Sequence, residues 1–308
     1  MNEIKRFDYT DILGWSISRY DKFLNCKRQY FYDYYAKYDK DVPIEKLQFL
    51  KNLTSKALET GNIVHDIIRD ILTRYKKSTK PINKDKLFKY VFDMTERYCS
   101  SKTFFEHYYN GEIIYVDEIY TKVKNTVLNL LKSQRFSWIE KNAIKQLDKW
   151  IIEPDGFGET RINNFKAFCK VDFLFPVEDK IYILDWKTGK ADEKKHSKQL
   201  LGYALWASCN FETKAENIVP IVAYLYPHYN EKNVKVSDFK MEELASSVEK
   251  ETKDMYEYLT DIEKNIPKDK KEFSLARNIF HCKYCSYKEI CPGSQVNNFQ
   301  NFKLIPGV

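Results

Sequence analysis

The chain is poor in glycine and proline, with nine of each among 308 residues. Disordered and repeat-rich chains are usually rich in these residues, so the shortage argues against both classes. No run of about eighteen apolar residues occurs, and we therefore expect no transmembrane helix. The stretch MNEIKRFDYTDILGW has no apolar core of the kind found in secretory signals, so we expect a cytoplasmic protein, or one of the host cytoplasm if a phage encodes it.

Two further features of the sequence narrow the possible functions. The chain has no G-x-x-x-x-G-K-[ST] phosphate loop, so it carries no helicase motor of its own, and any translocation would need a partner protein. Its seven cysteines are an odd number, which here indicates thiols or metal ligands rather than a disulfide framework.

Acidic residues are outnumbered by basic ones, 44 against 51, which gives a formal charge of +7. This surplus suits a polyanionic partner such as nucleic acid, although a lysine-rich surface that only aids solubility accounts for it equally well. A length of 308 residues with 43% hydrophobic residues is enough for one large domain, or for a core with an added lobe.

The spacing of apolar residues predicts a mainly helical first half. Ser16 and Ser18 are candidate N-caps for an aromatic-rich helix over 15–38. A second helix is predicted over 54–75, where isoleucine, valine and leucine recur at helical spacing. Further helices are predicted at 84–108, 115–135 and 138–147.

Short strands follow this helical half. A strand is predicted at 150–153, and a hairpin is predicted from 164–177 and 181–186 with a turn between them. The later predicted elements are a helix at 193–208, strands at 218–226 and 233–236, and a helix at 241–263. The fold class is therefore α/β, a small mixed sheet flanked by helices, with a helical insertion before it and a C-terminal cysteine module after it.

An aspartate and a lysine stand two residues apart on the second strand of the hairpin. Asp185 and Lys187 therefore point to the same face of the sheet, and Asp172 on the preceding strand can reach that face. Carboxylates within apolar strands are costly to bury unless they are paired or metal-bound, and their oxygens suit Mg²⁺ or Mn²⁺. For a D-x-K triplet by itself, a structural salt bridge is the more common explanation.

Three more polar residues add to this pattern. His65, in the segment GNIVH of the second helix, can supply an imidazole nitrogen to the same metal, although a lone helical histidine is more often structural. Gln199 and Tyr203 are four apart on the helix after the strand and share one face, from which they can contact DNA or brace the lysine.

In this order, the segments GNIVH, KVDFLF, ILDWKTGK and QLLGY resemble the PD-(D/E)XK nuclease superfamily, in its RecB-like branch. The resemblance implies a restriction-endonuclease-like fold. It makes Lys187 the catalytic lysine, and Gln199 and Tyr203 the Q-x-x-x-Y pair of the family. The ligands of Mg²⁺ or Mn²⁺ that it implies are His65, Asp172, Asp185 and the Trp186 carbonyl.

The chain departs from the family pattern in small ways. Val171 replaces the proline of the family name, and Phe173 stands where a basic residue often follows the aspartate. Neither change removes a ligand. Glu153, on the preceding strand, is a weaker candidate for approaching the metal.

The spacing of Cys282, Cys285 and Cys291 is C-x2-C-x5-C, and a four-cysteine site needs one more ligand from elsewhere. Iron–sulfur nucleases of the RecB-like branch, including the CRISPR-adaptation type (Cas four) and the AddB type, place one cysteine before the nuclease core and three after it. This layout implies Cys26 as the fourth ligand of a [4Fe–4S] cluster. A structural Zn²⁺ is the lesser alternative. The remaining cysteines, Cys99, Cys169 and Cys209, are expected to be ordinary core residues.

On this basis we expect four regions along the chain. They are an N-terminal helix with the first cluster cysteine at 1–50, a helical region with the histidine motif at 51–148, the nuclease core at 149–265, and an iron–sulfur module at 266–308 that packs against the N-terminal segment.

Two basic segments are candidates for DNA contact. The run KRQYFYDYYAKY at 27–38 offers aromatic faces to single-stranded DNA, although about half of its aromatics are expected to be buried on a helix face. Better candidates for contact with the phosphate backbone are Lys190, Lys194, Lys195 and Lys198.

The sequence therefore predicts a metal-dependent deoxyribonuclease that hydrolyses phosphodiester bonds, as an exonuclease on DNA ends or single strands. The alternative is a non-catalytic DNA-binding or assembly subunit of a repair, recombination or CRISPR-adaptation complex. A scaffold of that kind need not retain the set His65, Asp172, Asp185 and Lys187. RNA is the less favoured substrate, since no pattern identifies a reader of the 2′-hydroxyl.

Overall fold

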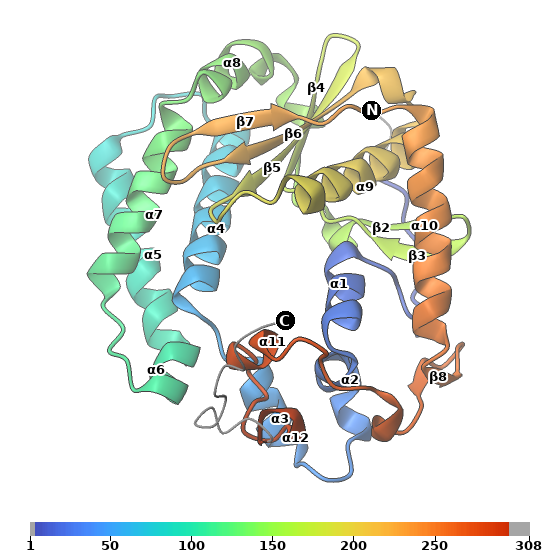
Figure 1. Ribbon diagram of the computed structural model, residues 1–308. Helices are drawn as coiled ribbons and strands as arrows, with labels where there is room; N and C mark the ends of the chain where they lie inside the picture. The colour runs from blue at the N-terminus through green and yellow to red at the C-terminus, as the bar shows by residue number, and fades with distance from the viewer. Residues whose placement is uncertain (1–3, 296–308) are drawn as a thin grey trace, which may run out of the picture. The chain divides into compact units, whose positions relative to one another are not determined.

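A computed structural model describes residues 4–295, and Figure 1 shows its ribbon. The ends of the predicted regions 1–50 and 266–308, at 1–3 and 296–308, lie outside the described residues. The chain divides into two compact units. The first, here named the sheet unit, takes the chain up to Thr10, Gly14–Ser16 and Thr54–Thr252, and the second, the cysteine unit, takes Asp11–Leu13, Ile17–Leu53 and the chain from Lys253 onward.

A five-stranded mixed sheet, in the order β1-β4-β5-β6-β7, forms the centre of the sheet unit. β4 is antiparallel to both β1 and β5, β5 is parallel to β6, and β7 is antiparallel to β6. This mixed α/β architecture confirms the predicted restriction-endonuclease-like fold class. The strands are β1 (Ile151–Ile152), β4 (Phe173–Val177), β5 (Lys180–Lys187), β6 (Ile218–Tyr224) and β7 (Asn230–Asn233).

Helices cover the sheet of this unit. The longest, α4, is amphipathic over 22 residues and begins at the N-cap Ser55, whose hydroxyl accepts a hydrogen bond from the Leu58 amide. The helices are α4 (Lys56–Lys77), α5 (Lys84–Ser101), α6 (Phe105–Asn110), α7 (Val116–Leu131), α8 (Gln134–Asn142), α9 (Glu193–Phe211) and α10 (Asp238–Tyr256), the last of which continues past Thr252.

Alternation along β5 gives its two sets of side chains different surroundings. Leu184 and Trp186 join the main apolar core, to which α4, α5, α7 and α8 also contribute. Asp185 and Lys187 belong to the other set. α9, whose buried residues are both polar and apolar, packs against β5 and β6, as Figure 1 also shows.

Two predicted helices are wrong as single elements. The helix over 15–38 is divided into α1 (Ile17–Asn25) and α2 (Lys27–Tyr35), because Cys26 between them has extended backbone angles. Its Sγ accepts a hydrogen bond from the Gln29 amide at 3.4 Å, so Cys26 is the N-cap of α2. The helix over 84–108 likewise ends at Ser101 and is followed by the separate helix α6.

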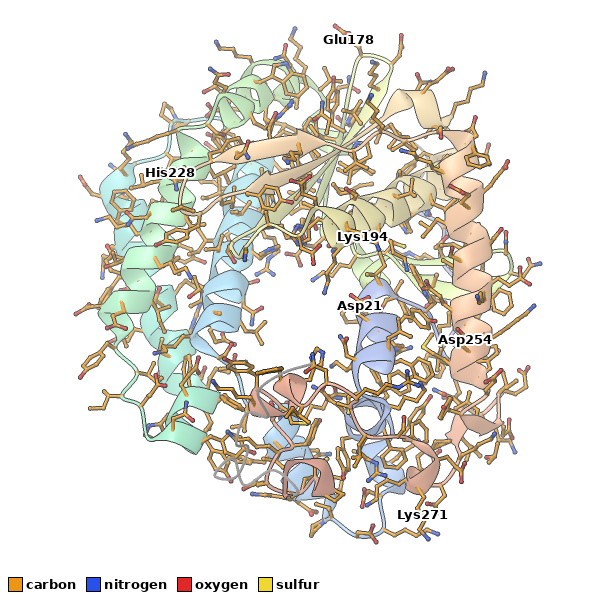
Figure 2. All side chains as sticks on the ribbon, in the orientation of Figure 1. Asp21, Glu178, Lys194, His228, Asp254 and Lys271 are labelled. Carbon is orange, nitrogen blue, oxygen red and sulfur yellow. The ribbon has the colours of Figure 1, made fainter. Side chains whose placement is uncertain are left out.

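The strand predicted over 164–177 is also divided. Its first part, β3 (Phe165–Phe168), pairs with β2 (Glu159–Ile162) in a separate two-stranded sheet, and its last part is β4. Asp172 therefore lies directly before β4 rather than within a strand. The hairpin of β4 with β5 is confirmed, with Glu178 at its turn in a left-handed conformation (Figure 2).

Gly158 lies close to the backbone at Cys169, in the segment that leads to Asp172. It has a φ of +65°, and a Cβ added there would lie 2.2 Å from the Cys169 carbonyl oxygen. We expect Gly158→Ala to lower the free energy of unfolding by about 2–5 kcal/mol, because a backbone clash adds to the strain of the left-handed conformation. Urea denaturation measures this loss.

Gly156→Ala is a matched control for that measurement. Gly156 has a φ of +66°, but a Cβ there would meet nothing within 4 Å, so the variant carries the conformational strain alone. Equal losses of stability in the two variants would contradict a clash with the Cys169 carbonyl.

The cysteine unit combines segments from near both ends of the described chain. Besides α1 and α2 it contains α3 (Ile44–Lys51), the paired strands β8 (Leu259–Asp261) and β9 (Ile266–Pro267), α11 (Phe280–Lys283) and α12 (Pro292–Gln295). The strand predicted at 233–236 lies earlier, as β7, and the helix predicted at 241–263 ends at Tyr256, before β8.

The core of the cysteine unit is aromatic. The ring centroid of Phe31 lies 5.0 Å from that of Phe273, and that of Tyr32 lies 5.0 Å from that of Tyr287. The buried aromatics of the run at 27–38 are Tyr30, Phe31, Tyr32 and Tyr35. These four rings have no free face for DNA bases, as expected for part of the run, while Tyr34 and Tyr38 are only partly buried.

A search of the described helices finds none with the length and apolarity needed to span a membrane.

Candidate active site

The candidate site begins with an ion pair at the end of β5. Asp185 is 1% exposed, and its Oδ2 lies 2.7 Å from Lys187 Nζ. β5 pairs with β4 on one side and β6 on the other, so this ion pair is not on a sheet edge. A surface salt bridge does not account for a carboxylate that is buried in a central strand, because burying a charge costs free energy.

Asp172 reaches the same place from the segment before β4. Its Oδ2 accepts a hydrogen bond of 2.9 Å from the backbone amide of Trp186, which stands between Asp185 and Lys187. Its Oδ1 lies 3.5 Å from Nδ1 of His65. One carboxylate thus bridges the end of β5 and helix α4.

His65 is brought to β5 by a close approach of α4. A Cβ on Gly61, one turn earlier, would lie only 3.3 Å from Thr188 Oγ1, which shows how closely α4 approaches the end of β5. The other ring nitrogen, Nε2, lies 3.1 Å from the Trp186 carbonyl oxygen. The structure therefore brings together the set His65, Asp172, Asp185 and Lys187, here named the acidic site, with the Trp186 carbonyl beside it.

The acidic site has strongly shifted pKa values. Burial, with the negative charge of Asp172, raises the pKa of Asp185 to about 6, although Lys187 acts in the opposite direction. Burial also acts to raise the pKa of Asp172, but His65 and then Lys187 outweigh it and lower that pKa. For His65, burial favours the neutral ring, yet the charge of Asp172 prevails and raises its pKa to about 9. Without a metal, a protonated His65 and Lys187 balance two buried carboxylates.

The predicted Q-x-x-x-Y pair also lies at this site. Gln199 Nε2 donates a hydrogen bond of 2.6 Å to the Tyr203 hydroxyl, and Tyr203 is 6% exposed. Burial and the charges of Asp185 and Asp172 raise the pKa of Tyr203 far above its ordinary value. Tyr203 therefore stays a neutral phenol, and the negative charges of the two aspartates act on its hydroxyl.

Glu153, the weaker candidate, is engaged with basic side chains. Its backbone amide donates to the Asp172 carbonyl at 3.1 Å, so it borders the site. Its carboxylate, however, lies 2.6 Å from Lys170 Nζ and 3.8 Å from Arg69 Nη1. The structure thus places Glu153 as a partner of two cations beside the site.

Sequence reasoning missed a pair of polar residues next to Lys187. Tyr224 of β6 is the register partner of Lys187, and its hydroxyl lies 3.0 Å from Nδ1 of His196 on α9. Burial, and then the charge of Lys187, lowers the pKa of His196. Only the parallel register of β5 and β6 brings Tyr224 opposite the lysine, and the sequence gives no signal of that register.

The donor atoms of the acidic site fit a hard divalent cation. Two carboxylates, a backbone carbonyl and an imidazole are suitable ligands for Mg²⁺ or Mn²⁺. Asp185 Oδ2 is buried without a hydrogen bond and has only the ion pair with Lys187. Over residues 4–295, no three histidine, cysteine or acidic side chains already surround one ion position. In the acidic site the nitrogens of His65 and Lys187 lie against the carboxylates, where a cation would compete with them.

Four cysteines line one cavity within the cysteine unit. This cysteine cavity has a volume of about 210 Å³, and it is bordered by Cys26, Cys282, Cys285 and Cys291. Burial, together with the charges of the neighbouring cysteines, raises the pKa of Cys285 to about 12. The fold therefore joins cysteines that are far apart in the sequence.

The other three cysteines lie elsewhere. Cys169 is buried, while Cys99 and Cys209 are half-buried. Of the lysines considered for phosphate contact, Lys190, Lys194 and Lys195 are exposed, and Figure 2 marks Lys194 on α9. Lys198 is held 2.6 Å from Glu251.

A mixed sheet with an aspartate–lysine pair at the end of its central strand, and a second aspartate beside it, defines a protein of the metal-dependent nuclease class. The chain belongs to the PD-(D/E)XK nuclease superfamily, whose family model matches residues 14–292. Members of this superfamily are typically nucleases that use Mg²⁺ or Mn²⁺.

A solved structure titled "Crystal structure of SSO0001" is similar, with 15% sequence identity and a TM-score of 0.33, over 67% of this chain and 96% of that chain. No curated protein matches the chain.

Proposed function

We propose that the protein is a metal-dependent deoxyribonuclease of the RecB-like branch, which hydrolyses phosphodiester bonds as an exonuclease on DNA ends or single strands. The observation that carries the proposal is the acidic site, assembled around a buried central strand in a member of a nuclease superfamily. A DNA-binding scaffold would have no need to hold the buried carboxylate of Asp185 near a second one, that of Asp172.

Each residue of the acidic site has a distinct part in this proposal. The cation would be held by Asp172, Asp185, the Trp186 carbonyl and His65, and when bound it polarises the scissile phosphate and lowers the pKa of a water molecule. Lys187 keeps a positive charge where negative charge develops on the phosphate.

Neighbouring groups fix the geometry of these residues. The Trp186 amide fixes one oxygen of Asp172, and the Trp186 carbonyl orients the His65 ring. Gln199 and Tyr203 form a neutral hydrogen-bonded pair near enough to the two aspartates for their charges to act on Tyr203.

The proposal includes a [4Fe–4S] cluster in the cysteine cavity, ligated by Cys26, Cys282, Cys285 and Cys291. The four cysteines border one cavity of about 210 Å³, which supports their acting together as the ligands of one group. Their layout, one cysteine before the nuclease core and three after it, favours the cluster over a single Zn²⁺.

The predicted regions of the chain enter the proposal as well. The grouping of Ile17–Leu53 with the chain from Lys253 onward supports an N-terminal segment that packs against the C-terminal cysteine module. Because the chain has no nucleotide-driven motor, we propose that a helicase, or a CRISPR-adaptation or repair protein, brings the DNA substrate to it.

An end-labelled cleavage assay on single- and double-stranded DNA tests the nuclease. Anaerobically purified protein should degrade DNA with Mg²⁺ or Mn²⁺ and not with EDTA. We expect Lys187→Ala to slow cleavage about 10²–10³-fold, as loss of one charge-stabilising donor does in other enzymes. The ladder of products gives the polarity.

Lys180→Ala is a matched control, because Lys180 is an exposed lysine at the other end of β5. It should cleave like the wild-type protein. A folded wild-type protein that binds DNA but cleaves none with either metal would instead favour the non-catalytic assembly subunit.

A further inference from the structure

We propose that Phe280 and Tyr284, here named the stacking pair, form a platform on the cysteine unit that stacks against the bases of single-stranded DNA. The inference rests on the proposed function, because it takes DNA as the substrate. It adds a binding site that lies apart in the sequence from the acidic site and contains none of its residues.

The stacking pair is unusually open to solvent. Phe280 is 71% exposed and Tyr284 is 72% exposed. Other aromatic side chains of this unit, such as Tyr30 and Phe273, are fully buried. Large aromatic surfaces are normally buried because their exposure costs free energy, so two adjacent exposed rings indicate a surface that binds something.

Both residues belong to one turn of the chain. Phe280 begins the single-turn helix α11 and Tyr284 is its C-cap, so the two residues stand four apart, a spacing at which helical side chains are neighbours. The residues between and after them, Cys282 and Cys285, line the cysteine cavity. Amide hydrogen bonds from Cys282 to the Ile279 carbonyl, at 2.9 Å, and from Cys285 to the Cys282 carbonyl, at 3.3 Å, hold the turn in place. The stacking pair therefore stands on a turn that the cavity-lining cysteines anchor.

The charges around the stacking pair favour a nucleic acid. Between Arg277 and Lys288 the sequence has three lysine or arginine residues and no aspartate or glutamate. Lys283 Nζ lies 5.5 Å from the centroid of the Tyr284 ring, where it adds a positive charge beside that ring. Aromatic faces for bases, combined with cations for phosphates, are the recognition chemistry of single-stranded nucleic acid.

Single-stranded DNA is favoured over duplex DNA for a simple physical reason. Bases inside a duplex already stack on one another, and only an unpaired base offers a free face to a protein ring. A duplex would meet the cations around the stacking pair but gain little from the two rings.

Binding of a fluorescein-labelled oligothymidylate in EDTA, at fixed salt, tests the proposal without cleavage. We expect Phe280→Ala and Tyr284→Ala each to weaken single-strand binding about 5- to 150-fold, the range for loss of one stacking contact. Binding of a blunt duplex should change less than about twofold, and the salt dependence should stay the same because no phosphate contact is removed. Tyr284→Phe should retain binding, since it keeps the ring.

Two controls keep the result specific. Phe49→Ala removes another exposed ring of the cysteine unit, on α3, which is 39% exposed and has Lys46 above its face. It should bind oligothymidylate like the wild-type protein. The absorbance and iron content of each variant show whether the turn that carries Cys282 remains intact.

The outcomes separate this inference from the nuclease proposal. Three outcomes would each overturn the proposed role of the stacking pair. They are unchanged single-strand binding in both alanine variants, equal losses for single strand and duplex, and no oligothymidylate binding by the wild-type protein. If the wild-type protein binds through the pair but never cleaves with metal, the platform stands and the nuclease proposal fails. If it cleaves and the variants bind normally, only the platform fails.

Discussion

Asp185→Asn is expected to abolish metal-dependent cleavage, lowering its rate by at least about 10³-fold, while the protein stays folded. The carboxylate is 1% exposed on the central strand and 2.7 Å from Lys187, where the amide has the same shape but no charge for a cation. Initial rates on end-labelled single-stranded DNA with Mn²⁺ measure the loss, and circular dichroism checks the fold.

The thermal stability of the same variant gives a second readout that needs no catalysis. Because burial and Asp172 raise the pKa of Asp185 from 3.8 to about 6, the charged form is disfavoured in the folded protein. The destabilisation of the folded protein by the charged form of Asp185 is complete above pH 6. It disappears as the pH falls from about 6 to 3.8, because Asp185 then binds its proton in the folded protein before it does in the unfolded one. In EDTA at pH 8, Asp185→Asn should therefore melt at the same temperature as the wild-type protein or higher.

Added Mg²⁺ should reverse this order. A ligand present at a hundred times its Kd stabilises the folded state by about 2.7 kcal/mol, so the melting temperature of the wild-type protein should rise by several degrees. The variant should show little rise. This difference reports binding of the cation by Asp185 independently of DNA.

Asp179→Asn is the matched control, because Asp179 is an exposed aspartate in the turn that opens β5. It should cleave DNA and respond to Mg²⁺ like the wild-type protein. Full cleavage by Asp185→Asn would remove Asp185 from the active site, and the assignment of the acidic site would have to be abandoned.

The predictable part of this site followed from periodicity. The period of two along β5 is enough to place Asp185 and Lys187 on one face, since side chains alternate in any strand. The apolar spacing of α4 similarly gives a buried helix that carries the GNIVH segment. Local patterns of this kind need no knowledge of the rest of the fold.

The position of Asp172 could not be predicted in this way. The segment 164–177 is uniformly aromatic and β-branched, so its composition favours one long strand. The chain nevertheless leaves β3 after Phe168, at a close approach of Gly158 to the Cys169 carbonyl that the composition does not signal. The bond from the Trp186 amide that fixes Asp172 depends on that same departure.

A similar limit applies to Cys26. Its aromatic neighbours continue a helical pattern on both sides, so nothing in the spacing signals the break that makes it the N-cap of α2. The C-x2-C-x5-C spacing is a local signal, but the fourth cysteine of the cysteine cavity, Cys26, lies more than 250 positions earlier in the chain. Only the resemblance suggested Cys26, and the cavity is a separate observation that supports it.

Cys285→Ser is expected to remove the proposed iron–sulfur cluster and to destabilise the cysteine unit. Binding of a structural metal adds about 10 kcal/mol or more to folding in zinc-finger peptides, which shows the scale of such a contribution. The variant should therefore lose its visible absorbance and expose segments of the cysteine unit to protease.

Elemental analysis of anaerobically purified protein decides between the cluster and its alternatives. The wild-type chain should contain about four iron and four sulfide, and Cys285→Ser should contain little of either. Cys209→Ser is the matched control, because Cys209 is half-buried on α9 and outside the cysteine cavity. One zinc per chain in the wild-type protein would establish a zinc site, and undiminished iron in Cys285→Ser would exclude Cys285 as a ligand. Because serine keeps the size of the side chain but not its thiolate, a loss of iron in this variant alone assigns the metal to the cavity.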